Sequence, residues 1–219
     1  KGDPAGRRAM LDDLLVARQP RWAGVRADYE RILKQRNALL KSAAPVLRKG
    51  AGRRPVRSSS LASDENPTSA RDSTLHTLDV WNHHLAEVGA QLLHARLRLV
   101  QVLEPVLGTA YEQVSAGTTL AHATYRAGLR EPVAAAIAAG EVPDVATLQE
   151  ELLAACAEVR AAEIERGVTL VGPHRDDLLL TLGSMPAKGY ASHGESWSLA
   201  LGLKLAAYQL LRRDLGDDP

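Results

Sequence analysis

The stretch VWNHHLAEVGAQLLHARLRLV, residues 80–100, decides the fold that this sequence predicts. Its apolar side chains recur at alternating steps of three and four residues, and the pattern continues to residue 106. Such spacing keeps a narrow apolar seam on one side of a helix, where it can face a partner helix as in a coiled coil. The seam consists of Trp81, Leu85, Val88, Leu92, Ala95, Leu99, Val102 and Val106.

Two other segments carry the same pattern. One runs through Trp22, Val25, Tyr29, Ile32, Arg36, Leu39 and Ala43, and the other through Val145, Leu148, Leu152, Ala155, Val159 and Ala162. At about 1.5 Å per residue, the first two helices would each be about 35–40 Å long. Arg36 is a costly seam residue unless its guanidinium reaches solvent or a carboxylate. Asp144 is a suitable N-cap for the third helix.

The segment between the first two helices, about residues 48–76, is rich in Gly, Pro, Ser, Asp and Asn and has no apolar period. It predicts a mobile loop at the tip of an antiparallel helical hairpin. A basic cluster lies at its start, made of Arg48, Lys49, Arg53, Arg54 and Arg57. Arg53, Arg54 and Arg57 are candidate DNA contacts through phosphate. The alternative is a solvated loop without a partner.

The pattern changes at Gly167, after which VTLVGP (168–173), DLLLTLG (177–183) and AKGYAS (187–192) are short apolar runs broken by Gly and Pro. Such runs are typical of strands with tight turns. HATYRAG (122–128) is a further possible strand, and helical spacing returns from Glu195. The predicted fold class is therefore mainly α with a small β portion, an α+β arrangement dominated by a long antiparallel hairpin.

The composition agrees with helix-on-helix packing, because 45% of residues are apolar while only 4% are aromatic and none is Phe. Cys156 is the single cysteine, which excludes an intrachain disulfide and favours a reducing compartment. The formal net charge of +1 does not point to a nucleic acid or a membrane surface. No apolar run approaches the roughly 18 residues of a membrane span. The start without Met or a signal region predicts the inside of a longer protein.

The first candidate site is YASHGESWSLALGLKLA, residues 190–206. Ser192 is a good N-cap, and Glu195 three residues later completes a capping-box pattern. Gly194 allows another group to approach the backbone closely. The free N–H groups at such a helix start favour an anion such as phosphate. The alternative is simply a well-capped helix.

The second candidate is GPHRDDLLL, residues 172–180, with His174, Arg175, Asp176 and Asp177 between two apolar runs. One interpretation is a metal or acid–base site. The favoured one is a structural or interdomain ion-pair role, because a strand would send neighbouring side chains to opposite faces. Arg7 and Arg8 could grip phosphate or form a solvated helix edge. The adjacent His83 and His84 would splay apart on a helix and make a poor metal pair.

Several kinds of catalytic site are missing from the sequence. No G-x-x-x-x-G-K-[ST] motif is present, and no apolar strand ends in the acidic residues that hold Mg²⁺ in a Walker B site. No plausible Ser-His-Asp set occurs, and one cysteine excludes a zinc ribbon. The residues alone therefore predict no catalytic residue and no metal site within this chain.

Five segments, taken in order, resemble the RecF recombination-repair family. They are RRAMLDDLL (7–15), YERILKQRNALLK (29–41), VWNHHLAEVGAQLLHARLRLV (80–100), GPHRDDLLL (172–180) and YASHGESWSLALGLKLA (190–206). The resemblance covers nearly the whole chain. RecF proteins are similar to the SMC and Rad50 family, whose ABC-type ATPase head carries an inserted helical arm. The resemblance implies an arm at residues 22–166, preceded by the end of a head subdomain (1–21) and followed by a head segment (167–219).

By the same resemblance, Ser192 and Gly194 match the family's signature motif Ser-Gln-Gly-Gln-Gln-Arg. His193, Glu195, Ser196 and Trp197 depart from it. The motif implies that Ser192 and the Gly194 backbone contact the γ-phosphate of ATP held by the opposite subunit of a head-to-head homodimer. Glu195 is better suited to capping the helix, because its charge would repel phosphate.

The resemblance also implies a function in DNA replication, recombination, repair and the SOS response. The expected activity is ATP-dependent binding to gapped DNA or single-strand/duplex junctions, with RecO and RecR as partners and RecA loaded indirectly. ATP and Mg²⁺ would belong to a full-length protein that is a weak DNA-dependent ATPase, with Walker motifs before Lys1 and after Pro219. This chain alone is expected to be inactive and to bind neither, and its location to be cytoplasmic. The alternative function is a non-enzymatic helical scaffold or a DNA-binding arm.

Overall fold

The computed structural model describes residues 3–49, 67–115 and 119–216. Within these ranges, the helices and strands are α1 (Pro4–Arg18), α2 (Trp22–Lys49), α3 (Pro67–Val114), β1 (Ala121–Arg126), α4 (Val133–Ala138), α5 (Val145–Arg166), β2 (Asp177–Leu182), β3 (Met185–Pro186), α6 (Ala187–Tyr190) and α7 (His193–Leu215). Helices dominate and the strands are few, so the predicted mainly-α fold class is confirmed.

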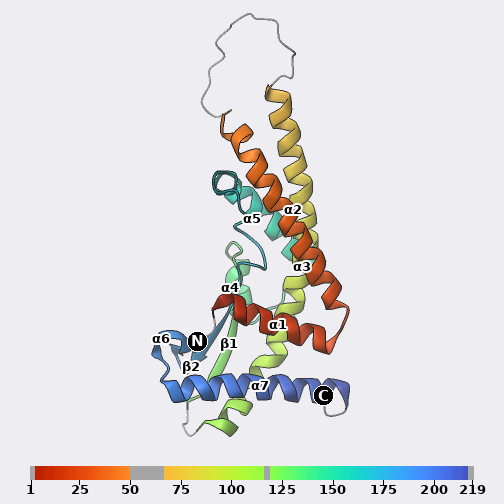
Figure 1. The fold of residues 1–219 in the computed structure, drawn as a ribbon. Coiled ribbons are helices and arrows are strands. Elements are labelled where there is room, and N and C mark those ends of the chain that lie inside the picture. Colours follow the sequence, from red (N-terminus) through yellow and green to blue (C-terminus); the bar gives the residue numbers. More distant parts are fainter. Residues whose placement is uncertain (1–2, 50–66, 116–118, 217–219) are drawn as a thin grey trace, which may run out of the picture.

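The hairpin of α2 and α3 rises from one end of the molecule, and α5 lies against both of its helices (Figure 1). The predicted seams face inward, since Tyr29, Leu85 and Leu152 are all buried in the shared core. Arg36 occupies its seam position fully buried and reaches the carboxylate of Glu163, which meets the condition set for it from the sequence. Asp144 caps α5 by accepting a hydrogen bond from the backbone N–H of Thr147 at 2.7 Å.

The predicted loop extends too far at its C-terminal side, because α3 already begins at Pro67. Residues 67–76 are therefore helical rather than part of a loop reaching to about residue 76. Proline suits the first position of a helix, where its missing N–H is not needed. Helix propagation is also favourable once the downstream seam has nucleated it, even through polar sequence. Arg53, Arg54 and Arg57, the candidate DNA contacts, lie outside the described residues.

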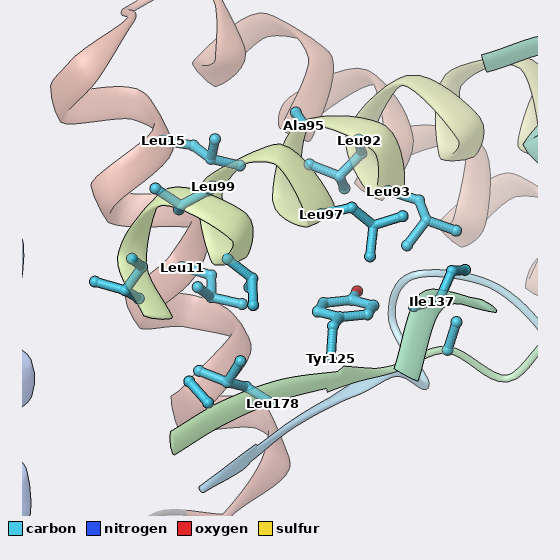
Figure 2. Packing of buried hydrophobic residues seen from close by; sticks show 14 of the residues in the cluster. Leu11, Leu15, Leu92, Leu93, Ala95, Leu97, Leu99, Tyr125, Ile137 and Leu178 are labelled. Atoms are coloured by element: carbon cyan, nitrogen blue, oxygen red, sulfur yellow. The ribbon is translucent and has the colours of Figure 1, made fainter. Parts of the chain in front are cut away.

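A small antiparallel sheet forms the other end of the molecule, with strand order β1-β2-β3. β1 pairs with β2 from Ala121 opposite Leu182 to Arg126 opposite Asp177. Alternate residues of β1 face the core, and Tyr125 and Leu178 pack there with Leu11 of α1 and Leu99 of α3 (Figure 2). The sheet thus joins strands from both sides of residue 167, and the domain division expected there stays a prediction.

Two of the predicted strands do not form. AKGYAS contains the short α6, which is a turn more than a regular helix, because Lys188 and Gly189 have non-helical backbone angles and Gly189 turns the chain at a φ of 92°. VTLVGP stays irregular, since its backbone groups bond to side chains instead of a neighbouring strand. The N–H of Thr169 donates to Asn37 Oδ1, and the N–H of Leu170 donates to Glu163 Oε1, both at 2.7 Å.

Helix α7 crosses the lower part of α3 and lies at the base of the molecule in Figure 1. One of its faces is buried against α3, and this face comprises Leu199, Gly202, Ala206 and Leu210. Gly202 allows the closest approach, because a Cβ there would lie 3.2 Å from the Cα of Tyr111. The opposite face carries large exposed apolar side chains, namely Trp197, Leu201, Tyr208 and Leu215.

Candidate functional site

The N-terminal turn of α7, Ser192 to Trp197, is called here the α7 turn. Ser192 is the N-cap, and its Oγ accepts a hydrogen bond from the N–H of Glu195 at 3.2 Å. Glu195 Oε2 accepts in return from the N–H and the hydroxyl of Ser192, both at 2.8 Å. The capping box predicted from the sequence is therefore present.

The α7 turn is open to solvent. Ser192, His193, Gly194 and Glu195 are all exposed, and the side chain of Trp197 is 77% exposed. A Cβ built on Gly194 would meet no atom within 4 Å, and its φ is not positive. The fold of the described residues therefore does not require glycine at 194, which leaves room for a group from outside to approach the backbone.

Glu195 places a negative charge on this turn. Its hydrogen bonds from the Ser192 N–H and hydroxyl lower the pKa of the carboxyl below its ordinary value, so it is ionised at neutral pH. A carboxylate stabilises a helix N-terminus. The Glu195 carboxylate also accepts the hydrogen bond from the Ser192 hydroxyl. This hydroxyl must therefore rotate away from Glu195 before it can donate to another acceptor.

The residues singled out in the sequence around 172–180 lie in a second polar region, which we call the junction segment (Thr169–Asp177). Asp177 accepts both arms of Arg7, with Nε to Oδ1 at 2.9 Å and Nη2 to Oδ2 at 2.8 Å. Arg8 donates from Nη1 to the carbonyl of Asp176 at 2.7 Å. The arginine pair of α1 thus binds the junction segment, and the ion-pair role favoured for Asp177 is what the structure shows.

Asp176 is buried, with 3% of its surface exposed, and has partners from β1 and the loop after it. Its carboxylate accepts from the hydroxyl of Tyr125 at 3.0 Å and from the N–H of Gly128 at 2.8 Å. Burial is the largest influence on this group and raises the pKa of Asp176 to about 6, although these hydrogen bonds and the nearby Arg96 oppose the shift. Asp176 therefore remains a carboxylate at pH 7.

His174 connects the junction segment to α2. Its Nδ1 lies 2.8 Å from the hydroxyl of Tyr29, and its Nε2 lies 3.2 Å from the carbonyl of Thr169. Burial lowers the pKa of His174 to about 4, so the ring is neutral at pH 7. Because a carbonyl can only accept, Nε2 carries the proton and Nδ1 accepts from Tyr29. Arg175 closes the turn by donating from Nη2 to the same carbonyl at 2.8 Å.

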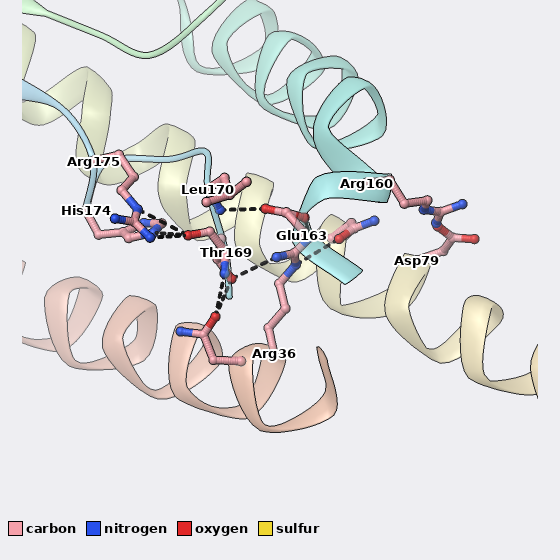
Figure 3. Close-up of polar contacts among 10 residues, drawn as sticks. Arg36, Asp79, Arg160, Glu163, Thr169, Leu170, His174 and Arg175 are labelled. Carbon is pink, nitrogen blue, oxygen red and sulfur yellow. Dashed lines mark hydrogen bonds and ion pairs between the residues drawn. The ribbon is translucent and has the colours of Figure 1, made fainter. Parts of the chain in front are cut away.

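Two buried arginines hold this region from the long helices. Arg36 donates to Asn82 Oδ1, Thr169 Oγ1 and Glu163 Oε2 at 2.9, 2.8 and 2.5 Å (Figure 3). Arg96 forms a bidentate pair with Asp12 at 2.7 and 2.8 Å and donates to the carbonyl of Pro173 at 2.7 Å. Removing one partner from such a pair would leave a buried charge uncompensated, which is strongly destabilising.

The pair of Arg96 and Asp12 was not predicted from the sequence, although a signal for it exists. The neighbours of Arg96 one turn away in each direction are Leu92, Leu93, Leu99 and Val100. An arginine surrounded by apolar residues at these spacings must be buried in an amphipathic helix, and a buried arginine needs a carboxylate. The sequence does not reveal which carboxylate, because Asp12 lies 84 positions away.

The possible metal interpretation of residues 174–177 is not supported by the geometry. His174 faces Tyr29, Asp176 faces Tyr125 and Asp177 faces Arg7, so the three side chains diverge. Within the described parts of the chain, no three His, Cys, Asp or Glu side chains gather as metal ligands would. His83 and His84 also diverge, with His83 bonded to the Asp79 carbonyl and His84 against Trp81.

Two solved structures share this arrangement. They are described as the recombination mediator protein RecF in the RecFOR pathway, one as RecF-ATPrS and the other as RecF-ATP. Each superimposes on the whole chain with a TM-score of 0.77, at 22% and 21% identity, and this chain covers 50% and 49% of them. A hairpin mounted on a small sheet and a capped helix is thus the fold of part of a RecF-type protein.

The curated relatives have the same name. Proteins called DNA replication and repair protein RecF from Beutenbergia cavernae and Kineococcus radiotolerans are both 52% identical, over 98% and 100% of this chain. That of Streptomyces avermitilis is 51% identical over 100%. No protein-family model matches. The chain belongs to the RecF family of DNA replication and repair proteins, and it spans about half (51%) of the length of these relatives.

No helix in residues 3–49, 67–115 and 119–216 combines the length and the apolar content that crossing a membrane requires. The predicted roles of Ser192, Gly194 and Glu195 toward a nucleotide are not tested by these comparisons and stay predictions.

Proposed function

We propose that this chain supplies the signature part of an ATP-dependent DNA-binding protein of the RecF type, in which the α7 turn closes over ATP held by a second subunit. The supporting observation is the open helix start itself. Ser192 and Gly194 are exposed at the N-terminus of a 23-residue helix, where unpaired N–H groups and the helix dipole favour phosphate. A glycine that its own fold does not need agrees with close approach by such a ligand.

The proposal includes the DNA that the protein acts on and its partners. ATP-driven pairing of two subunits would clamp gapped DNA or a single-strand/duplex junction, and the clamp would act with RecO and RecR to help load RecA. ATP and Mg²⁺ would be held by the full-length protein, in the cytoplasm. This proposal is supported by about 50% identity to RecF proteins along the whole chain. The 219 residues alone are expected to show no ATP turnover, and measurable turnover would contradict this.

The decisive experiment replaces Ser192 in the full-length protein and follows ATP-dependent dimerisation by light scattering. Ser192→Asp keeps a good N-cap but adds a negative charge where the γ-phosphate would lie. We expect the dimer to be lost while the melting temperature is retained. The matched control is Ser196→Ala, whose hydroxyl bonds only to the Ser192 carbonyl at 2.8 Å within the same turn. Undiminished dimerisation of Ser192→Asp would overturn the proposal.

A second variant tests the role assigned to Glu195. Glu195→Gln retains the capping box, because glutamine also accepts from the N-cap N–H, but removes the charge next to the proposed phosphate. The ATP concentration needed for half-maximal dimerisation should fall several-fold. An increase in this ATP concentration would show that the Glu195 carboxylate does not repel the nucleotide, which would contradict the role assigned to its charge.

A further inference from the structure

The junction segment is bonded to the hairpin through α2. Tyr29 meets His174, Arg36 donates to Thr169 Oγ1, and Asn37 Oδ1 accepts from both the N–H and the hydroxyl of Thr169 at 2.7 and 2.8 Å. Figure 3 shows Arg36 reaching Thr169 from α2 while Glu163 approaches from the end of α5. Two places on α2, about two turns apart, are therefore fixed to one short segment.

The same segment is bonded on its other side to α1 and the sheet, which together with α7 form the base of the molecule. Asp176 accepts from Tyr125 and Gly128, and Asp177 binds Arg7, after which the chain continues into β2.

At Gly172 the junction segment passes very close to α2. Its φ is 125°, and there is no room for a side chain, since a Cβ would lie 2.6 Å from the hydroxyl of Tyr29. Only glycine fits a position that combines this φ with this contact.

The alternative connection between hairpin and base is α3, which runs through both. This helix contains Pro105, between Arg96 near the hairpin and Tyr111 under α7. A proline removes one hydrogen bond from a helix and is the usual place for long helices to bend. The junction segment bridges the region around this proline, because it is held by Arg96 on one side and continues into β2 of the sheet on the other.

The geometry points to residues 169–177 as the coupling element that fixes the direction of the α2–α3 hairpin relative to the α7 turn. This assigns a role to His174, Asp176 and Asp177 together: they transmit position between two parts of the molecule rather than bind a ligand. The inference rests on the proposed function for one consequence. If the hairpin meets DNA and the α7 turn meets ATP, this segment is the path by which one contact biases the other.

The first test measures the geometry in the full-length protein, whatever its function. Nitroxides at Ala38→Cys in α2 and Ala200→Cys in α7, both exposed positions, report the distance between hairpin and base. The native cysteines are replaced by alanine beforehand. Tyr29→Phe with Thr169→Val removes only two hydroxyl groups from the junction. The matched control is Thr77→Val, whose hydroxyl bonds to the Ser73 carbonyl within α3.

We expect the distance distribution from pulsed electron resonance to become at least twofold wider in the double variant and to stay narrow in the control. A width that stays unchanged while the melting temperature falls would reduce the junction to a purely stabilising role and overturn the inference. If the double variant does not fold, Tyr29→Phe alone removes a single oxygen and decides the same question.

The second test uses ATP and a gapped DNA duplex. In the double variant, the stimulation of dimerisation by DNA should fall at least fivefold, while dimerisation driven by ATP alone stays within twofold of the wild type. Full stimulation would contradict the coupling. If the wild-type protein shows no ATP-dependent dimer, the proposed function fails, and the distance measurement still decides the role of the junction segment by itself.

Discussion

The junction segment and the α7 turn are both polar, but their partners lie in different places. In the junction segment, His174, Asp176 and Asp177 each have partners from other elements. Two buried arginines, Arg36 and Arg96, also donate hydrogen bonds to this segment. In the α7 turn, Ser192 and Glu195 bond only to each other and their own helix, with solvent around them. The first arrangement stabilises the fold, and the second leaves groups available for a ligand.

The largest expected effect comes from removing a charge in the buried region. Arg36→Met leaves Glu163 buried without its partner, and breaking a buried pair this way costs about 3–5 kcal/mol. The free energy of unfolding from urea titration should fall by that amount. The double variant Arg36→Met with Glu163→Leu should recover only part of the loss, since it leaves no unpaired charge but takes the acceptor Glu163 Oε1 from the Leu170 N–H. A small loss for the single variant would mean that water reaches Glu163.

The next effect is a pH dependence of stability, which in the wild-type protein is hidden because two contributions oppose each other. The folded pKa of His174 is lowered to about 4, so stability from this residue is lost as the pH falls from 6.5 toward 4. The folded pKa of Asp176 is raised to about 6, so the contribution of this residue to the stability of the folded protein increases as the pH falls from 6 toward 4. The two contributions have opposite signs over the same range and largely cancel.

Single replacements should separate these contributions. Relative to the wild type, Asp176→Asn should lose stability as the pH falls from 6.5 to 4, and His174→Gln should gain stability, each on the order of 1–3 kcal/mol. Urea midpoints measured at several pH values check this, and comparison with the wild type removes the shared effect of the other carboxylates. Parallel pH profiles for the two variants would contradict the opposing signs.

The smallest expected effect compares two glycines of α7. Gly202→Ala should lower the free energy of unfolding by about 1 kcal/mol, because its Cβ would press on the backbone of α3 at Tyr111. Gly194→Ala should leave stability unchanged or slightly higher, since alanine is the better helix residue and nothing lies nearby. If the α7 turn meets ATP as proposed, only Gly194→Ala should also weaken ATP-dependent dimerisation. Equal changes in melting temperature for the two variants would contradict the predicted difference in stability between these two positions.

The sequence predicts the parts of this molecule that follow a period. The three-four seams locate α2, α3 and α5, and the Ser192–Glu195 spacing predicts the capping box correctly. Arg36 was recognisable as a seam residue that needs either solvent or a carboxylate, and the structure shows the second, supplied by Glu163. These features depend on residues near each other in the chain, where helical geometry fixes which side chains meet.

The features that sequence analysis missed depend on distant partners. VTLVGP has the composition of a strand, but Asn37 and Glu163 capture its N–H groups before any strand can. The pairs of Arg96 with Asp12 and Arg7 with Asp177 join positions 84 and 170 residues apart. The local pattern indicates that such a residue needs a partner, but only the folded chain brings the partner to it. The start of α3 at Pro67 was missed because polar sequence can continue a helix that a distant seam has nucleated.

The position of Arg36 also has a consequence for the order in which the protein assembles. Its partners Glu163 and Thr169 are 127 and 133 residues further along the chain, whereas Asn82 of the hairpin is only 46 away. During synthesis, the α2–α3 hairpin is complete long before α5 leaves the ribosome, and a guanidinium at its centre still lacks its carboxylate. We therefore expect the hairpin to stay loosely closed around a hydrated Arg36 and to become tight only when the chain beyond residue 163 arrives. The arginine would thus delay commitment of the early helices until the later ones can join them.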